Sequence, residues 1–309
     1  MICIHDSHSA TFNITFFMSN NQKSGNQNKI IPPRGTYMFL GMKGCGKTTF
    51  FTAMCKLLQH KGNNSEHFKF EFIPRRIDHP GANSTYDYIT YNWDGIEKQY
   101  WPDKTDSSKK VQQHCLHPYM CELTQKRSFM WDKRYTICNI DYPGEAFRAA
   151  FSPNGTYDGA DDNIRNIATL LKLTVKDAKG IFLLIDAQSI LTANDDEKNN
   201  IDKRLSALFR HIREQFFEPR VAVIFNKMEL YNYPGADNDV HNEFKNRFSN
   251  AYTAMQKMSN KAIFFAYPFG KLDYREDGTP IPPRHREPKN ILEIAEWVFD
   301  IGKGTLTSQ

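Results

Sequence analysis

The stretch Gly41-Met-Lys-Gly-Cys-Gly-Lys-Thr48 decides the fold that we expect for this chain. It fits the pattern G-x-x-x-x-G-K-[ST], in which a glycine-rich loop turns its backbone N–H groups inward around phosphate oxygens. The apolar run Tyr37–Leu40 precedes it and the helix-like segment Thr48–His60 follows it, so the positive end of a helix dipole favours an anion there. In such a loop Lys47 reaches the β- and γ-phosphates and the Thr48 hydroxyl binds Mg²⁺. The stretch therefore predicts a nucleoside triphosphate site, with Lys47 solvated when no ligand is bound.

Further apolar runs predict more buried strands. Most of them are continuous rather than alternating, as in strands that are covered on both faces of a parallel sheet. Helix-like segments separate most of the runs, which indicates an α/β protein. The runs are Tyr135–Ile140, Ile181–Ile185, Val221–Phe225 and Ala262–Ala266, and the helix-like segments are Asp161–Ala178, Asp195–Phe217, Asp239–Met258 and Asn290–Ile301. We expect a three-layer α/β P-loop NTPase fold, with a mostly parallel sheet, one antiparallel strand and helices on both faces.

The stretch from Lys61 to Arg134 interrupts this alternation. It is long, contains several prolines, and is rich in Tyr, Asn, Asp and His. We expect an inserted excursion at about 61–134, plus one strand near Val111–Leu123 that pairs antiparallel with Tyr135–Ile140. Because long functional loops carry recognition, this insertion is also the expected surface for an unidentified protein partner.

Composition bounds the class of protein. The chain has 309 residues, of which 40% are hydrophobic and 24% are charged, so a packed core is expected. Residues 1–32 read as a flexible N-terminal tail, because the polar tract Ser19–Lys29 cannot bury itself, and residues 33–309 as one P-loop domain. The net charge of +5 comes without a long basic block, so no nucleic-acid partner is evident. No stretch approaches the length of a transmembrane helix, and six scattered cysteines indicate reduced thiols in a cytoplasmic protein.

The segment Ile140-Asp-Tyr-Pro-Gly-Glu145 follows a predicted strand. Asp141, at the strand end, stands where a carboxylate near Mg²⁺ belongs. Gly144 follows three residues later and can offer its backbone N–H to the γ-phosphate. A plain Pro-Gly turn is the alternative interpretation.

The segment Phe225-Asn-Lys-Met-Glu229 follows another predicted strand. Asn226 can hydrogen-bond a purine N7 and the adjacent loop, Lys227 can lay its stem over a base, and Glu229 can accept two N–H bonds from a guanine edge. A polar turn is again the alternative. All three motifs fall at carboxyl ends of strands, where open α/β sheets bind ligands.

The three motifs GMKGCGKT, DYPGE and NKME, in that order, resemble the phosphate, switch and base motifs of Ras-like (TRAFAC) P-loop GTPases. Within that superfamily the chain most resembles the bacterial double-GTPases (DO-GTPases) of predicted conflict systems, over about residues 36–301. The resemblance implies a cytoplasmic, Mg²⁺-dependent protein that binds GTP and hydrolyses it to GDP and phosphate. It also implies a nucleotide-controlled molecular switch in a bacterial conflict or defence system.

The resemblance also assigns roles to residues. Lys47, Glu145 and Thr105 become catalytic. Thr105 is the threonine of the first switch, with Thr85 and Thr90 as alternatives. The expected Mg²⁺ ligands are Thr48, Asp141 and Thr105. The expected nucleotide contacts are Gly41, Lys43, Gly44, Cys45, Gly46, Lys47, Thr48, Thr49, Gly144, Asn226, Lys227 and Glu229.

Three departures from the family pattern leave the function open in part. One is that the last base-contacting loop, normally Ser-Ala, is at best Ala266-Tyr267 here. Glu229 stands where the family usually has aspartate, and the extra methylene changes the reach toward guanine. Glu145 stands where Ras-like enzymes place a water-positioning glutamine, so its charge can either orient water or repel the γ-phosphate. An ATPase of the same fold and a nucleotide-bound interaction module with little hydrolysis are therefore the alternatives.

Overall fold

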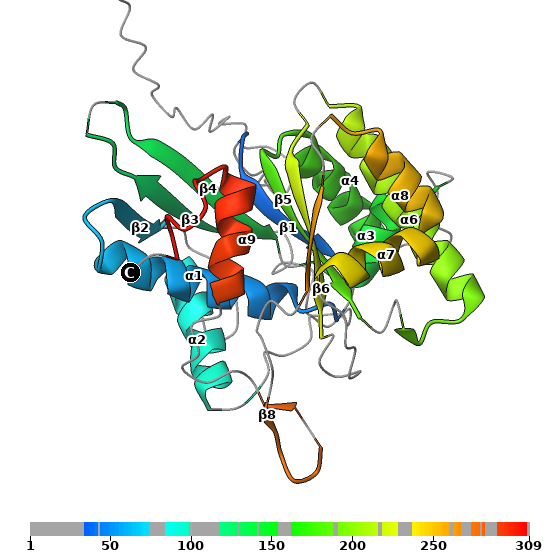
Figure 1. The fold of residues 1–309 in the computed structure, drawn as a ribbon, viewed down its shortest axis with the longest axis horizontal. Coiled ribbons are helices and arrows are strands. Elements are labelled where there is room, and N and C mark those ends of the chain that lie inside the picture. Colours follow the sequence, from blue (N-terminus) through cyan, green and yellow to red (C-terminus); the bar gives the residue numbers. More distant parts are fainter. Residues whose placement is uncertain are drawn as a thin grey trace, which may run out of the picture.

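The central element of the computed structural model is a seven-stranded sheet with the strand order β2-β3-β4-β1-β5-β6-β7 (Figure 1). The structure describes residues 34–42, 44–74, 84–98, 100, 118–128, 130–140, 142–153, 162–187, 191–215, 218–227, 237–259, 262–266, 273–278, 280–281 and 289–307. The strands are β1 (Tyr37–Gly41), β2 (Phe68–Phe72), β3 (Pro118–Gln125), β4 (Lys133–Ile140), β5 (Gly180–Asp186), β6 (Arg220–Asn226) and β7 (Ile263–Ala266). In this sheet β3 runs antiparallel to both of its neighbours, and the other pairs are parallel. The prediction of a mostly parallel sheet with one antiparallel strand is confirmed.

Helices cover both faces of the sheet and make three layers (Figure 1). On one face lie α1 (Lys47–Asn63), α2 (Thr85–Glu97) and α9 (Lys289–Phe299). On the other face lie α3 (Gly144–Ala150), α4 (Asp162–Lys176), α6 (Asp195–Arg213), α7 (Asp237–Arg247) and α8 (Ser249–Gln256). A separate small hairpin joins β8 (Asp273–Tyr274) to β9 (Pro280–Ile281). The predicted helices on both faces are therefore confirmed.

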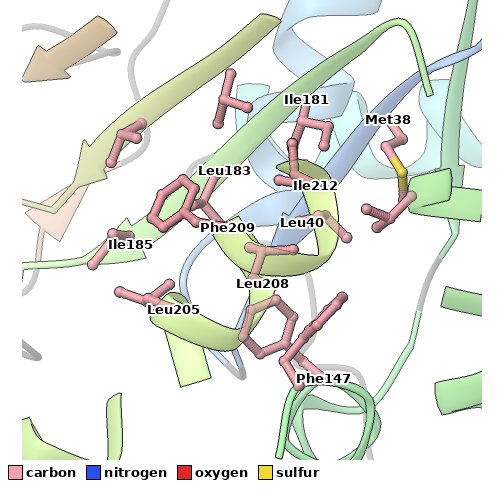
Figure 2. Close-up of a cluster of buried hydrophobic side chains, with 14 of the residues drawn as sticks. Met38, Leu40, Phe147, Ile181, Leu183, Ile185, Leu205, Leu208, Phe209 and Ile212 are labelled. Carbon is pink, nitrogen blue, oxygen red and sulfur yellow. The ribbon is translucent and has the colours of Figure 1, made fainter. Parts of the chain in front are cut away.

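The continuous apolar runs are explained by burial on both faces. Along β5, Ile181 and Leu183 belong to the core beneath α6, whereas Phe182 belongs to the core beneath α1. Figure 2 shows the first of these cores, where β5 side chains meet Leu208 and Phe209 of α6. A strand that alternates between two cores needs apolar side chains at every position.

The second core is built on aromatic rings. The ring of Phe39 on β1 stacks on that of Phe182 on β5, with ring centroids 4.7 Å apart and planes 8° from parallel. Phe50 and Phe51 on α1 complete the contact around Phe39. Because β1 leads into the motif and α1 leads out of it, this packing fixes both ends of the phosphate-binding loop.

Two elements in the 61–134 stretch differ from the expectation of a single strand there. Strand β2 has alternating exposure, and its sequence Phe-Lys-Phe-Glu-Phe carries that period. Helix α2 begins after Ser84, whose hydroxyl accepts a hydrogen bond from the N–H of Asp87 at 3.2 Å. The predicted strand itself is present as β3, from Pro118 onward. The expectation of one strand in this stretch was therefore wrong. The prolines that interrupt it obscured two local signals, the helix cap at Ser84 and the alternation of apolar and polar residues along β2.

The predicted helix Asp239–Met258 is in fact two helices, α7 and α8. The break falls at Phe248, whose φ of −125° and ψ of 58° are not helical and whose side chain is buried. The carboxylate of Asp202 on α6 accepts hydrogen bonds from the N–H groups of Asn250 and Ala251, at 3.2 and 2.7 Å. This carboxylate satisfies N–H groups that a helix start leaves without partners, so the chain can begin a second helix.

Replacing Phe182 by alanine is expected to lower the free energy of unfolding by roughly 3–5 kcal/mol, because the variant loses the stacked ring and leaves a cavity beside Phe39. Chemical denaturation monitored by circular dichroism measures the change. The control is Trp131→Ala, whose side chain is 94% exposed and whose loss should change stability by no more than about 0.5 kcal/mol. Similar values for the two variants would contradict the aromatic core.

Candidate functional site

The predicted site residues that the structure describes lie where parallel strands end. The last residue of β1, Gly41, pairs with Leu184 of β5, and Asp186 of β5 pairs with Asn226 of β6. The side-chain amide of Asn226 donates a hydrogen bond to the carbonyl of Cys45 at 3.0 Å. The end of β6 is therefore joined directly to the glycine-rich loop, although the two are 181 residues apart in the sequence.

The loop needs glycine for two physical reasons. Gly46 has a φ of 86°, which only glycine adopts without strain. A Cβ at Gly46 would also collide with the amide of Asn226, and one at Gly41 would collide with the Leu184 carbonyl and the Cys45 sulfur. The backbone thus lies against the strand ends, and α1 begins immediately afterwards, at Lys47. A helix start behind a turned backbone is the geometry that binds phosphate.

Lys47 is buried, with only 8% of its surface exposed. Its ammonium donates hydrogen bonds to the carbonyls of Gly41 and Met42, at 3.1 and 3.2 Å. It also lies 4.6 Å from the centre of the Tyr142 ring. The prediction that Lys47 is solvated without ligand was therefore wrong, because carbonyls and an aromatic face replace water around the charge.

Tyr142 is a contact that the sequence did not reveal. It stands inside the DYPGE segment, between β4 and α3, and is 1% exposed. Its hydroxyl accepts from the N–H of Gly41 at 2.9 Å and donates to the carbonyl of Gly41 at 3.0 Å. The second motif therefore touches the first through this side chain.

Asp186 makes the other contact that the sequence did not reveal, an ion pair with Lys227. Its carboxylate pairs with the ammonium of Lys227 at 2.6 Å, and its side chain is 13% exposed. Lys227 has a φ of 65°, and its N–H donates to the Asn226 side-chain oxygen at 3.0 Å. Lys227 is therefore held through its backbone N–H and through its ammonium. A carboxylate at the end of the run Ile-Phe-Leu-Leu-Ile was the available signal.

Cys45 is a buried loop thiol. Burial raises the pKa of the Cys45 thiol above its usual value, and the nearby Lys47 charge opposes that shift. The thiol therefore stays protonated at neutral pH, and its backbone carbonyl makes the contact to Asn226. We infer a packing role for this side chain rather than a nucleophilic one.

The oxygens near the loop suit magnesium. Thr48 lies half-buried in the first turn of α1, and Thr49 beside it is buried. In the part of the chain that the structure describes, no three His, Cys, Asp or Glu side chains cluster as a metal cage. Mg²⁺ is usually held by one or two protein oxygens together with phosphates and water. The Thr48 hydroxyl at the phosphate loop therefore fits that ion.

Helix α3 begins at Gly144, directly after Pro143. Glu145 lies half-buried in the first turn of this helix. Gly144 and Glu145 thus follow the end of β4, which lies next to β1 in the sheet.

The remaining predictions divide into two groups. Lys43, Thr105, Asp141 and Glu229 lie outside the described residues. Both alternatives for the first-switch threonine lie within α2. Of these, Thr85 is fully buried and its hydroxyl oxygen accepts from the N–H of Met120 at 3.2 Å, so it holds α2 against β3.

A glycine-rich loop between a buried strand and a helix, at the carboxyl edge of a parallel sheet, defines a P-loop nucleotide-binding protein. The family model of Double-GTPase 2 matches residues 38–269. The chain therefore belongs to the Double-GTPase 2 family, which confirms the resemblance and places it among GTP-binding proteins of the GTPase class.

Comparison with curated proteins finds no match. Among solved structures, one similar chain is from the signal recognition particle receptor SRb-GTP/SRX complex of Chaetomium thermophilum. It shares 11% identity and a TM-score of 0.34, over 76% of this chain and 90% of that one. Another is the GTP-bound Ski7 GTPase-like domain of S. cerevisiae, with 14% identity and a TM-score of 0.34 over 76% of this chain and 43% of that one. Scores of this size support no detailed comparison, so the family assignment rests on the family model.

Replacing Asp186 by asparagine is expected to weaken GTP binding by roughly five- to fiftyfold, because the Lys227 ammonium loses the charge that holds it. Isothermal titration calorimetry measures the affinity. The control is Asp162→Asn on α4, which removes an ion pair of an aspartate that is 91% exposed and should leave affinity unchanged. An unchanged affinity in the Asp186 variant would mean that the pair only packs the strand ends.

Proposed function

We propose that this protein binds GTP with Mg²⁺, hydrolyses it to GDP and phosphate, and acts as a nucleotide-controlled switch in a bacterial conflict or defence system. The observation that carries the proposal is the hydrogen bond between Asn226 and the Cys45 carbonyl, at 3.0 Å. It brings a base-reading strand end and a phosphate-binding loop together, and both ends of a nucleotide need to be held at once. Membership of the Double-GTPase 2 family supports the same conclusion.

In the proposed reaction the chain mainly positions the nucleotide and the groups that stabilise its phosphate oxygens. Phosphoryl transfer passes through a transition state in which charge spreads over phosphate oxygens, and donors aimed at those oxygens stabilise it. Lys47 and the N–H groups at the start of α1 are such donors. Thr48, with Asp141 and Thr105, would hold Mg²⁺, which neutralises developing charge when bound. Gly144 would offer its N–H to the γ-phosphate, and Glu145 would orient the attacking water.

Base selection depends on the end of β6. Asn226 faces the loop, and the Asp186 carboxylate holds Lys227 for contact with a base. Glu229 would accept two N–H bonds from a guanine edge. An ATPase of the same fold, or a module that binds nucleotide and hardly hydrolyses it, remains an outcome of the experiments below.

Partner binding is proposed for the 61–134 stretch. Helix α2 in this stretch carries two tyrosines, Tyr86 and Tyr91, that are about half exposed. Tyrosine is enriched at protein interfaces because it combines apolar area with a polar end.

The described helices include none long and apolar enough to cross a membrane. We propose that the switch acts in the cytoplasm, through a protein bound at α2.

Replacing Lys47 by alanine is expected to weaken GTP binding at least about 100-fold, because the variant lacks the ammonium that contacts the phosphates. Calorimetric titration with GTP and with ATP measures both affinities, and wild-type turnover of each nucleotide is measured in parallel. The control is Lys56→Ala, which removes a lysine on the same helix that lies near the ring of Tyr86. The affinity of this variant for GTP and ATP should equal that of the wild type. Equal binding by the Lys47 variant would contradict the phosphate site, and faster turnover of ATP would identify an ATPase.

Replacing Glu145 by alanine is expected to lower kcat for GTP by roughly 10²–10⁴-fold with nucleotide affinity nearly kept, if the carboxylate orients water. Phosphate release under saturating GTP gives kcat, and calorimetry gives the affinity. Glu276→Ala, in the exposed turn between β8 and β9, is the control. Tighter GTP binding with an unchanged kcat would refute the catalytic role, and would show that Glu145 only repels the γ-phosphate.

A further inference from the structure

The Tyr142 hydroxyl makes hydrogen bonds to both polar backbone groups of a single residue, Gly41. The oxygen accepts from the Gly41 N–H at 2.9 Å and donates to the Gly41 carbonyl at 3.0 Å. The two residues are 101 positions apart, and the contact is buried. A pair of bonds to both polar groups of one residue fixes the distance and the direction between the two segments.

The same tyrosine also contacts the phosphate lysine. The ammonium of Lys47 lies 4.6 Å from the Tyr142 ring centre, and it donates to the Gly41 carbonyl that the hydroxyl also contacts. Each of the three residues Tyr142, Gly41 and Lys47 therefore contacts the other two. A displacement of any one of them changes the surroundings of the other two.

The segment that carries Tyr142 is stiff. Tyr142 and Gly144 are two residues apart, so their Cα atoms are at most about 7 Å from one another. Between them Pro143 has its φ fixed, at −66°, and its carbonyl accepts from the N–H of Ala146 at 2.9 Å. Beyond Gly144, the side chains of Ala146 and Phe147 anchor α3 in the core. A movement of Gly144 therefore reaches Tyr142, because the segment has little freedom to absorb it.

We propose that Tyr142 is a positioning residue that couples the segment between β4 and α3 to the phosphate-binding loop. This inference rests on the proposed function, because Gly144 reports a γ-phosphate only in a protein that binds the triphosphate. The hydroxyl fixes the position of Gly144 relative to Gly41. The phosphate-binding loop, which holds the first phosphates of the nucleotide, thereby sets the position of the Gly144 N–H, which contacts the γ-phosphate. The selectivity for triphosphate over diphosphate depends on this relative position.

The test is the variant Tyr142→Phe, which keeps the ring and deletes the hydroxyl. Affinities for GDP and for the slowly hydrolysed analogue GTPγS are measured by calorimetry with Mg²⁺. We expect the preference for GTPγS over GDP to fall about three- to tenfold, because the variant lacks the hydrogen bonds to Gly41. An unchanged preference, even with both affinities lowered, would show that Tyr142 only supports the loop, and a raised preference would show that its bonds oppose the triphosphate state. Either result overturns the coupling.

The matched control is Tyr135→Phe. Tyr135 lies near the opposite end of β4, is equally buried, and donates its hydroxyl to the Gln125 side-chain oxygen at 3.1 Å. Its loss should lower thermal stability without changing the nucleotide preference. A wild-type protein that binds neither GDP nor GTPγS would refute the proposed function itself, which separates that failure from a failure of the coupling.

A second measurement covers the case in which Tyr142→Phe binds too weakly for calorimetry. Hydrogen–deuterium exchange of residues 142–150 in the wild type, with GTPγS and with GDP, reports on the segment directly. Coupling requires slower exchange with GTPγS, and a loss of that difference in the variant at saturating nucleotide. The same exchange difference in both proteins would contradict the proposal.

Discussion

The close contact of the loop Gly41–Lys47 with the ends of neighbouring strands is the constraint on which this site depends. Side-chain atoms are excluded at Gly41 by the Leu184 carbonyl and at Gly46 by the Asn226 amide. The loop backbone therefore lies against the strand ends, and α1 begins directly after it, an arrangement that suits an anionic ligand. The fold around the loop serves to keep that contact in place.

The two cores keep the strand ends from moving. Because β1 and β5 are buried on both faces, and the rings of Phe39 and Phe182 stack between them, neither strand can shift without opening a cavity. Helix α1 packs on the same rings and carries Lys47 and Thr48 at its start. A site built on such elements is positioned more accurately than one built on loops alone.

In the part of the site that the structure describes, two lysines are held by protein oxygens. Lys47 is bound by the Gly41 and Met42 carbonyls, and Lys227 is bound by the Asp186 carboxylate. These contacts reduce the conformational freedom of both side chains, which lowers the entropy cost of ordering them. The carbonyl contacts also prevent the buried Lys47 ammonium from being an isolated charge.

The sequence by itself determined the local architecture, because a glycine spacing, an apolar run and a helix start are encoded by neighbouring residues. The loop, the parallel strands and the helices on both faces were predictable on those grounds. Signals for β2 and α2 were also present, in the alternation of Phe68–Phe72 and the cap at Ser84, although a proline-interrupted stretch obscured them. Only the tertiary structure decided which strand ends adjoin. The contacts of Tyr142 with Gly41, of Asp186 with Lys227 and of Asn226 with Cys45 join residues 101, 41 and 181 positions apart. Such contacts follow from the strand order β4-β1-β5-β6, which depends on how the whole chain crosses between strands, and no local pattern records that path.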